Sequence, residues 1–290
     1  MHKFLRAIGF SDITKKDLEM ILDEVITRPE IMKITKDPEG NEFAELSGSF
    51  AANAGITVRG TYQEDDSFHM DYYYPYVFGT SITTNEQIDV EKHAEKESYA
   101  GVCDEVNLGV TLIFYIQNVA DYLAETNRHL SKIHYGAMLA GLSTEGKILC
   151  PVVERKKNDV PAIQKNDRHN QLIAQAREGD EDAIESLTLE DMDTYALLSQ
   201  RVMKEDIFSI VKSTFMPFGI ESDQYTVLGE IIDCVTMENR LTHEKLYGMK
   251  LLCNNIQFDV CINEKDLLGE PAIGRRFRGN VWMQGNLCLE

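Results

Sequence analysis

The sequence predicts an α+β fold. It begins with a mainly antiparallel sheet packed by helices, continues through a helical connector and ends in a small β-barrel. Three observations support this prediction: short segments with β character follow an amphipathic helix, a strongly acidic helical stretch lies in the middle, and segments with β character fill the chain after residue 207. A chain of 290 residues is long enough for about two domains.

The amino-terminal half opens with a well-marked helix. Thr14 stands three residues before Asp17, as in a capping box, and apolar residues recur at helical spacing from Leu18 until Pro29 interrupts the pattern. Turn-forming residues then separate four short segments with β character, which predicts an antiparallel meander. The four predicted strands comprise residues 31–35, 42–50, 56–62 and 68–78.

The rest of this half is also mixed. A charged stretch, residues 86–105, precedes an apolar strand at 108–116, and Asn118 is placed to cap a following helix. A turn at residues 143–146 separates two further predicted strands. These strands comprise residues 135–142 and 147–153.

A charged run at 154–159 predicts a domain boundary, which gives an amino-terminal domain at 1–158, a helical connector at 159–206 and a carboxy-terminal domain at 207–290. The connector is acidic, with ten acids against two bases between residues 178 and 206. The last domain suits an oligonucleotide/oligosaccharide-binding (OB)-like barrel, and a small sheet packed on the preceding helices is the alternative. Its predicted strands comprise residues 208–215, 225–235, 245–253, 256–262 and 277–289, with a helical turn at 263–268.

Charge and cysteine content narrow the function. The net charge is −19 and both halves are acidic, so phosphate backbones and anionic membranes are repelled at long range, and we predict neither as a partner. The six cysteines form no Cys-x-x-Cys pair and are expected to be free thiols. Arg6 interrupts a possible signal peptide, and the apolar segment 108–116 is too short for a membrane helix. These features predict a cytoplasmic protein.

The segment 68–78 is unusually rich in tyrosine. On a strand, His69, Asp71 and Tyr73 share one face, where the first two can supply acid–base groups while the aromatic rings stack on a flat ligand. The structural alternative is a sheet with an aromatic core face and an amphipathic outer face. It is favoured because aromatic residues are good strand formers.

Other signs of catalysis are weak. His93, Glu95 and Glu97 alternate as metal ligands can, but they lie among further charged residues that indicate a solvated segment. The sequence contains neither a Gly-x-Ser-x-Gly elbow nor a phosphate-binding glycine motif. We therefore predict no metal site and no cofactor, and an enzyme is less favoured than a binding protein.

One basic cluster stands out near the carboxy-terminal end. Arg275, Arg276 and Arg278 precede Trp282, the only tryptophan, in a glycine-rich segment. The structural interpretation is a bent last strand that closes the barrel, with Trp282 at least half buried against the connector and the arginines near its acidic face. The functional alternative is a small anion- or partner-binding surface.

Three segments together resemble a clostridial family of about this length whose function is not characterised. They are MHKFLRAIGF at 1–10, TLEDMD at 188–193 and RFRGNVWMQG at 276–285. The resemblance covers essentially the whole chain and implies a bacterial cytoplasmic protein. It carries over no catalytic residue, ligand or partner.

Two functional hypotheses follow. The first is a non-enzymatic cytoplasmic binding or regulatory protein, which a protein partner would suit, and its oligomeric state stays open. The alternative is a small-molecule-binding or hydrolytic enzyme domain centred on residues 68–78. A deep pocket around His69, Asp71 and Tyr73 would favour the alternative, whereas a packed, flat sheet there would favour the first hypothesis.

Overall fold

The computed structural model describes most of the chain. The described residues are 1–92, 98–127, 134–152, 211–219 and 223–289, together with positions 175, 180, 183, 185 and 186. Of the described residues, 55% lie in strands and 16% in helices. The predicted α+β class is therefore wrong, because this part of the chain is mostly β and forms two sheets.

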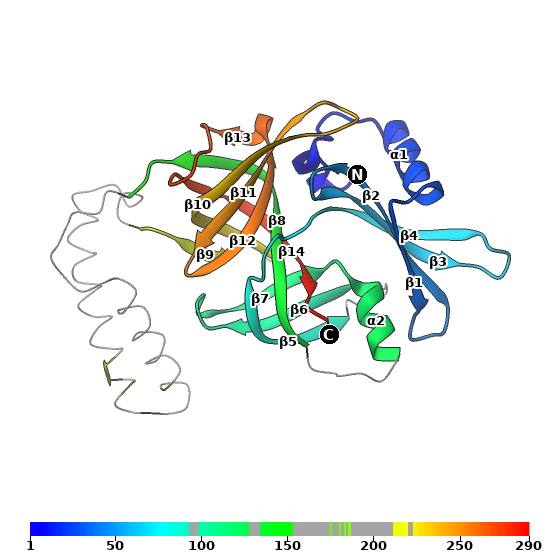
Figure 1. Cartoon of the computed structure of the whole chain (residues 1–290), viewed down its shortest axis with the longest axis horizontal. Coiled ribbons are helices and arrows are strands. Elements are labelled where there is room, and N and C mark those ends of the chain that lie inside the picture. The colour runs from blue at the N-terminus through cyan, green and yellow to red at the C-terminus, as the bar shows by residue number, and fades with distance from the viewer. Residues whose placement is uncertain are drawn as a thin grey trace.

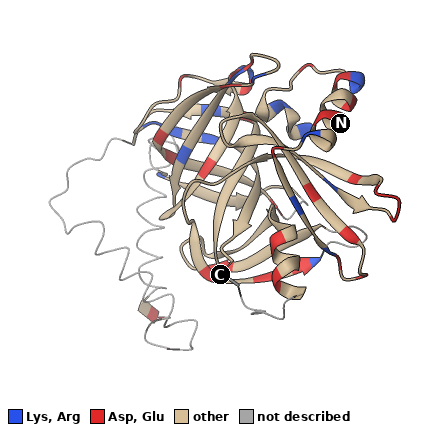
Figure 2. Ribbon diagram, turned by 45° about the vertical axis from the view of Figure 1, so that its right-hand side comes forward, with Lys and Arg blue, Asp and Glu red and all other residues tan. Residues whose placement is uncertain are grey.

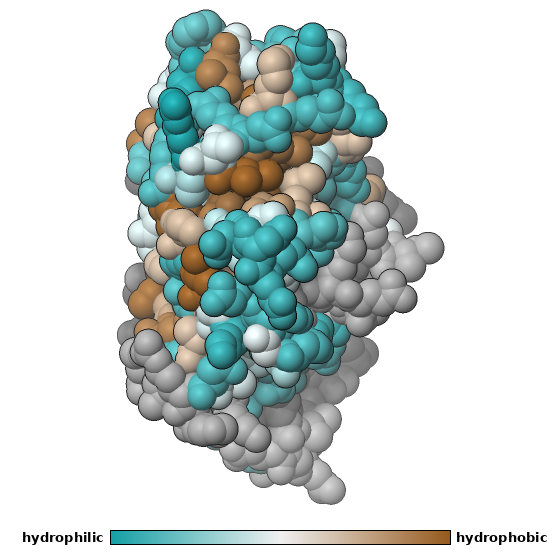
Figure 3. Space-filling view, turned by 90° about the vertical axis from the view of Figure 1, so that its right-hand side faces the viewer, coloured by the Kyte–Doolittle hydropathy of each residue, from teal (hydrophilic) through white to brown (hydrophobic). Residues whose placement is uncertain are grey.

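The smaller sheet is the predicted antiparallel meander, in the order β1–β2–β3–β4. Its strands are β1 (Ile31–Lys36), β2 (Glu42–Ala51), β3 (Ala54–Tyr62) and β4 (Phe68–Val77). Helix α1 (Lys15–Thr27) packs against β2 and β3, and the capping box between Thr14 and Asp17 is confirmed. Figure 3 views the molecule from this side, where apolar side chains form a band between hydrophilic regions.

The larger sheet joins strands from both halves of the chain. They are β5 (Thr84–Lys92), β6 (Tyr99–Glu105), β7 (Val110–Ile116), β8 (His134–Leu149), β9 (Thr214–Pro217), β10 (Gln224–Glu238), β11 (Lys245–Cys253), β12 (Ile256–Asn263), β13 (Leu267–Leu268) and β14 (Arg276–Leu287). Strand pairing closes two circuits, β10–β11–β12–β8–β14 and β8–β5–β6–β7–β14, which share the pair β8–β14 (Figure 1). Side chains from both circuits, including Phe114, Leu139 and Phe258, form one core.

Two sequence predictions fail around β8. The predicted turn at 143–146 is instead the middle of one continuous strand of 16 residues. The Ser143 hydroxyl donates to the carbonyl of Glu145 and to that of Asn280 on β14, where the register shifts, so the irregularity is absorbed within the sheet. The charged stretch 86–105, assigned no strand from the sequence, contributes most of β5 and all of β6.

The predicted OB-like barrel of residues 207–290 is also wrong. β8 pairs in parallel with β12 and antiparallel with β14 and lies between them, so the carboxy-terminal strands share a sheet with a strand from the predicted amino-terminal domain. Periodicity identified most of these strands but not their partners. The domain division at 158 stays a prediction, and most of the predicted connector 159–206 lies outside the described residues.

A second core lies between the two sheets. The short helix η1 (Lys3–Ile8) contributes Phe4, Leu5 and Ile8 to it, and it packs against β4, β8 and β12. Helix α2 (Val119–Asn127) packs against β1 and β2 of the smaller sheet. Asn118 precedes α2 as predicted, but its side chain bonds to the backbone of Leu287. Within the described part of the chain, the helices are too short or too polar to cross a membrane.

Candidate functional site

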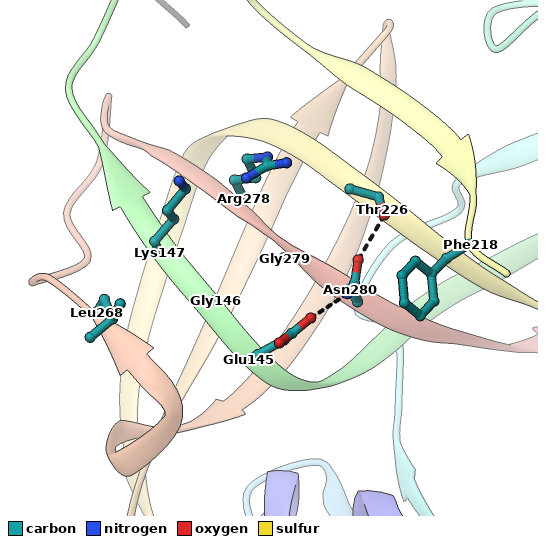
Figure 4. A pocket seen from close by; sticks show the side chains of 9 residues that line it. All are labelled: Glu145, Gly146, Lys147, Phe218, Thr226, Leu268, Arg278, Gly279 and Asn280. Carbon is teal, nitrogen blue, oxygen red and sulfur yellow. Dashed lines mark hydrogen bonds between the residues drawn. The ribbon is translucent and has the colours of Figure 1, made fainter.

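A pocket opens on the larger sheet where β8, β14 and β10 lie side by side (Figure 4). Its volume is about 380 Å³, which falls within the range of small-molecule sites. The lining residues are Glu145, Gly146, Lys147, Phe218, Thr226, Leu268, Arg278, Gly279 and Asn280.

Two glycines set the shape of the floor. Gly146 lies opposite Gly279 in the β8–β14 register, and the buried ring of Phe277 lies against the inner side of this pair. A Cβ atom added at Gly146 would lie 2.4 Å from a ring carbon of Phe277, so a larger residue does not fit there. Because side chains alternate along a strand, the residues on either side of the glycines point to the opposite face and into the pocket.

The polar side chains of the pocket form two cross-strand pairs. Lys147 lies opposite Arg278, and Glu145 lies opposite Asn280. The Asn280 amide donates to the Glu145 carboxylate, and the Thr226 hydroxyl donates to Asn280 Oδ1 over 2.7 Å. Figure 4 shows the two cations on one side of the glycine pair and the fixed amide on the other.

The cation pair places two positively charged side chains next to each other in the lining of the pocket. Lys147 and Arg278 lie directly opposite each other, so one anionic group can contact both side chains. The guanidinium can bind a carboxylate or phosphate with two parallel hydrogen bonds, and the ammonium adds a point charge. In Figure 2, blue bands that mark Lys and Arg gather on the strands of the β10–β11–β12–β8–β14 circuit, although the chain as a whole carries a net charge of −19.

Apolar side chains border the same pocket. Phe218 is 43% exposed and Leu268 is 74% exposed, which is unusual for large apolar residues. The Phe218 N–H donates to the carbonyl of Gln224 over 2.8 Å, which ties the backbone of this residue to the start of β10. A ligand with an anionic group and a flat apolar part would therefore find both kinds of contact.

The structure separates the basic cluster predicted from the sequence. Arg278 lines the pocket, whereas Arg275 donates to the carbonyl of Glu270 outside it. Arg276 is buried, donates to the carbonyls of Cys150 and Val211, and has its pKa lowered by burial. Of the three arginines, only Arg278 thus lines this pocket.

Trp282 belongs to the core. It is only 6% exposed, which confirms that it is at least half buried, and its indole N–H donates to Asp223 over 2.7 Å. Its ring stacks on Phe4 of η1 at 5.2 Å between centroids and also lies near the ring of Tyr115 of β7, whereas most of the connector predicted to cover it lies outside the described residues. The predicted approach of the arginines to the acidic face of residues 178–206 lies outside the described residues.

The candidate residues of the aromatic strand lie apart from the pocket described above. His69 and Asp71 are close, with Nδ1 and Oδ1 3.7 Å apart, but the His69 side chain is 70% exposed. The Tyr73 hydroxyl accepts from the backbone N–H of His2. None of the three lines the pocket at Lys147, and none lines a second cavity of the molecule, whose lining includes Glu45 and Gln117.

Sequence reasoning missed most of the pocket. Lys147 and Asn280 come from strands far apart in the sequence, and only the β8–β14 register brings them together. No single-sequence pattern predicts that register, although paired glycines in two strands were a weak sign of close approach. Among the described residues, no group of three His, Cys, Asp or Glu side chains could hold a metal ion, and the alternating residues 93–97 lie outside the described part.

Comparison with known proteins identifies the family. A family model with the description "Domain of unknown function, E. rectale Gene description (DUF3881)" matches residues 5–285. The chain belongs to the DUF3881 family. The predicted resemblance to an uncharacterised clostridial family is thereby confirmed. No curated protein and no solved structure matches this DUF3881 chain.

Proposed function

We propose that this DUF3881 protein is a non-enzymatic binding protein whose ligand is a small molecule with a carboxylate or phosphate group. The observation that carries the proposal is the cross-strand pair of Lys147 and Arg278 in a pocket of about 380 Å³. The anionic group lies between the two cations, where the guanidinium contacts it with two hydrogen bonds. The apolar part of the ligand lies along Phe218.

The chemistry of the pocket supports binding over catalysis. In its described lining, the one hydroxyl is that of Thr226, which donates to Asn280.

A possible catalytic pair lies elsewhere in the molecule. Ser11 Oγ is 2.8 Å from Lys265 Nζ, and some hydrolases use a serine–lysine pair of this kind. Hydrogen bonds to Glu244 and Asp12 raise the pKa of Lys265, so this amine stays protonated and is no base for Ser11.

The alternative function, centred on residues 68–78, has less support because His69 and Asp71 lie on an exposed face outside both cavities. We expect no appreciable binding to single-stranded nucleic acid, since the two positive charges of the pocket offset little of the net charge of −19.

Action in the cytoplasm is part of the proposal, because six free thiols suit a reducing compartment.

The test is a thermal-shift titration of the full chain with three matched compounds. Phenyl phosphate and benzoate carry the anionic group on an aromatic ring, and benzamide is their neutral counterpart. We expect the two anions to raise the unfolding temperature in a saturable and salt-sensitive way, because ion pairing is screened by salt. Benzamide should have little effect.

Two variants locate the binding. Arg278→Gln should weaken binding of the anions about tenfold or more, which corresponds to about 1.4 kcal/mol. Arg275→Gln is the matched control, since this arginine lies in the same segment but outside the pocket. Equal shifts with the anions and benzamide, or equal losses in both variants, would show that the pocket is not an anion site.

A further inference from the structure

A second cavity, of about 320 Å³, lies between the two sheets beside α2. Strands β1, β2 and β3 line it on one side, and α2, β8 and β14 line it on the other. Four of its polar side chains, Glu45, Ser47, Thr57 and Gln117, are each less than a tenth exposed. We propose that this inter-sheet cleft binds a neutral small molecule that carries several hydroxyl groups.

The Glu45 carboxylate is fixed at the cleft by partners on both oxygens. Oε1 accepts from Arg59 Nε over 2.7 Å, and Oε2 accepts from the N–H of Ala120, in the first turn of α2, over 3.0 Å. The guanidinium balances the charge of the carboxylate. Glu45 therefore serves as an oriented hydrogen-bond acceptor whose charge is already compensated.

Arg59 itself has no N–H left for a ligand. It is fully buried, and all five of its N–H groups have partners. The acceptors are Glu45 Oε1, the hydroxyls of Tyr72, Tyr74 and Tyr115, and the carbonyls of Ile116 and Gln117. An anion in the cleft would gain no hydrogen bond from this guanidinium, which argues against an anionic ligand.

Gln117 supplies the independent observation that points to a ligand. It lines the cleft and is 5% exposed, and its Oε1 accepts no hydrogen bond among the described residues. Its amide nitrogen donates to the Val77 carbonyl and to Gln284 Oε1, which fixes the orientation of the group. A buried acceptor without a donor is costly, so a ligand hydroxyl that supplies one would be favoured.

The remaining lining matches the two kinds of surface on a polyol. The hydroxyls of Ser47 and Thr57, opposite each other on β2 and β3, are 2.8 Å apart and form a second polar point. Phe78, Met138 and Leu287 provide apolar contacts for C–H groups. A ring or chain with hydroxyls on one edge and C–H groups on the other satisfies both surfaces.

The ion pair of the cleft also favours a neutral ligand. Lys33 of β1 contacts Asp121 of α2 at 2.5 Å, and both side chains are 40% exposed, so they lie nearer the solvent than Glu45 does. With Glu45 paired to Arg59, the four charges sum to zero. A charged ligand would lose hydration on entry and find no uncompensated partner here.

The test uses four probes on the full chain: glycerol, D-ribose, D-glucose and myo-inositol. The protein carries ¹³C-methyl methionine, so that the Met138 methyl reports from the cleft and the Met249 methyl, buried in the other core, serves as reference. We expect at least one probe to shift the Met138 signal in a saturable way and to leave Met249 unchanged. Ethanolamine and glycolate, the charged comparators, should bind more weakly than that probe.

The variants remove single hydroxyls with little change of shape. Thr57→Val and Ser47→Ala should each weaken binding about tenfold. Thr61→Val, the same change further along β3 and outside the cleft, should leave it unchanged. Saturation of none of the probes, tighter binding of a charged comparator, or equal affinity in all three variants would overturn the proposal. None of these changes touches Lys147 or Arg278, so the outcome is independent of the proposed anion site.

Discussion

Arg59 on β3 and Glu45 on β2 form an ion pair inside the protein, with 2.7 Å between Nε and Oε1 and with neither side chain more than 5% exposed. The pair lies where the two sheets meet, because Tyr115 of β7 contacts the same guanidinium. A cross-sheet network of this kind holds the smaller sheet in one position against the larger one.

Removing one member of the pair should destabilise the fold strongly. Arg59→Met leaves the Glu45 carboxylate buried without a counter-charge, and we expect a loss of about 3–5 kcal/mol in the free energy of unfolding. Urea denaturation followed by circular dichroism measures it. The control is Arg240→Met, which breaks the exposed contact with Glu30 and should cost less than about 1 kcal/mol. Equal effects would contradict a structural role for the buried pair.

The pH dependence of stability should contain a contribution from His2. Burial lowers the pKa of His2 from 6.5 to about 4, and the positive charges of Lys3 and the amino terminus act in the same direction. Between these two values the unfolded chain binds a proton that the folded chain does not. Stability should therefore fall as the pH decreases from 6.5 to about 4, and this contribution should be fully lost below that value.

His2→Gln isolates this contribution. The variant keeps a polar side chain but has no group that titrates in the same interval, so its unfolding temperature should change less between pH 6.5 and pH 4. Thermal unfolding of both proteins across the interval gives the comparison. Parallel curves for the two proteins would show that His2 has the same pKa in the folded state as in the unfolded state.

The six thiols should differ widely in reactivity. Cys150 is exposed, whereas Cys253 and Cys261 are buried, and burial raises the pKa of both thiols to about 12. Because the thiolate is the reactive form, an alkylating reagent near neutral pH should modify Cys150 first. Mass spectrometry of peptides after a time course should find Cys253 and Cys261 modified only after denaturation. Early modification of either would contradict the packing of β11 and β12.

Local signals in the sequence account for the parts of the fold that were predicted correctly. The capping box at Thr14 and the meander β1–β4 depend on neighbouring residues, because each strand pairs with the next one across a short turn. The charged segment that forms most of β5 lacks the alternation of apolar and polar residues that would have predicted a strand. Only Thr84 and Ile88 of β5 are buried, and solvated side chains surround them.

The site could be predicted only in part for a related reason. Arg278 was singled out as a cation near the end of an acidic chain. Lys147 could not be assigned to the pocket from the sequence, because only the β8–β14 register places it opposite Arg278. Likewise, Glu45, Arg59 and Tyr115 are unremarkable in the sequence and meet only where the two sheets pack. Long-range pairing of this kind leaves no periodic pattern in a single sequence.

Trp282 joins the last strand to the amino-terminal segment, and its removal should be costly. The ring is 6% exposed and stacks on Phe4 at 5.2 Å, while its N–H donates to Asp223 over 2.7 Å. Trp282→Ala should lower the free energy of unfolding by about 3–5 kcal/mol, because it leaves a cavity under η1. Trp282→Phe keeps an aromatic ring and should cost less. Urea denaturation followed by circular dichroism compares the two variants. Tryptophan fluorescence cannot serve, because Trp282 is the only tryptophan and neither variant retains it. An unchanged midpoint for Trp282→Ala would mean that η1 does not pack on this strand in solution.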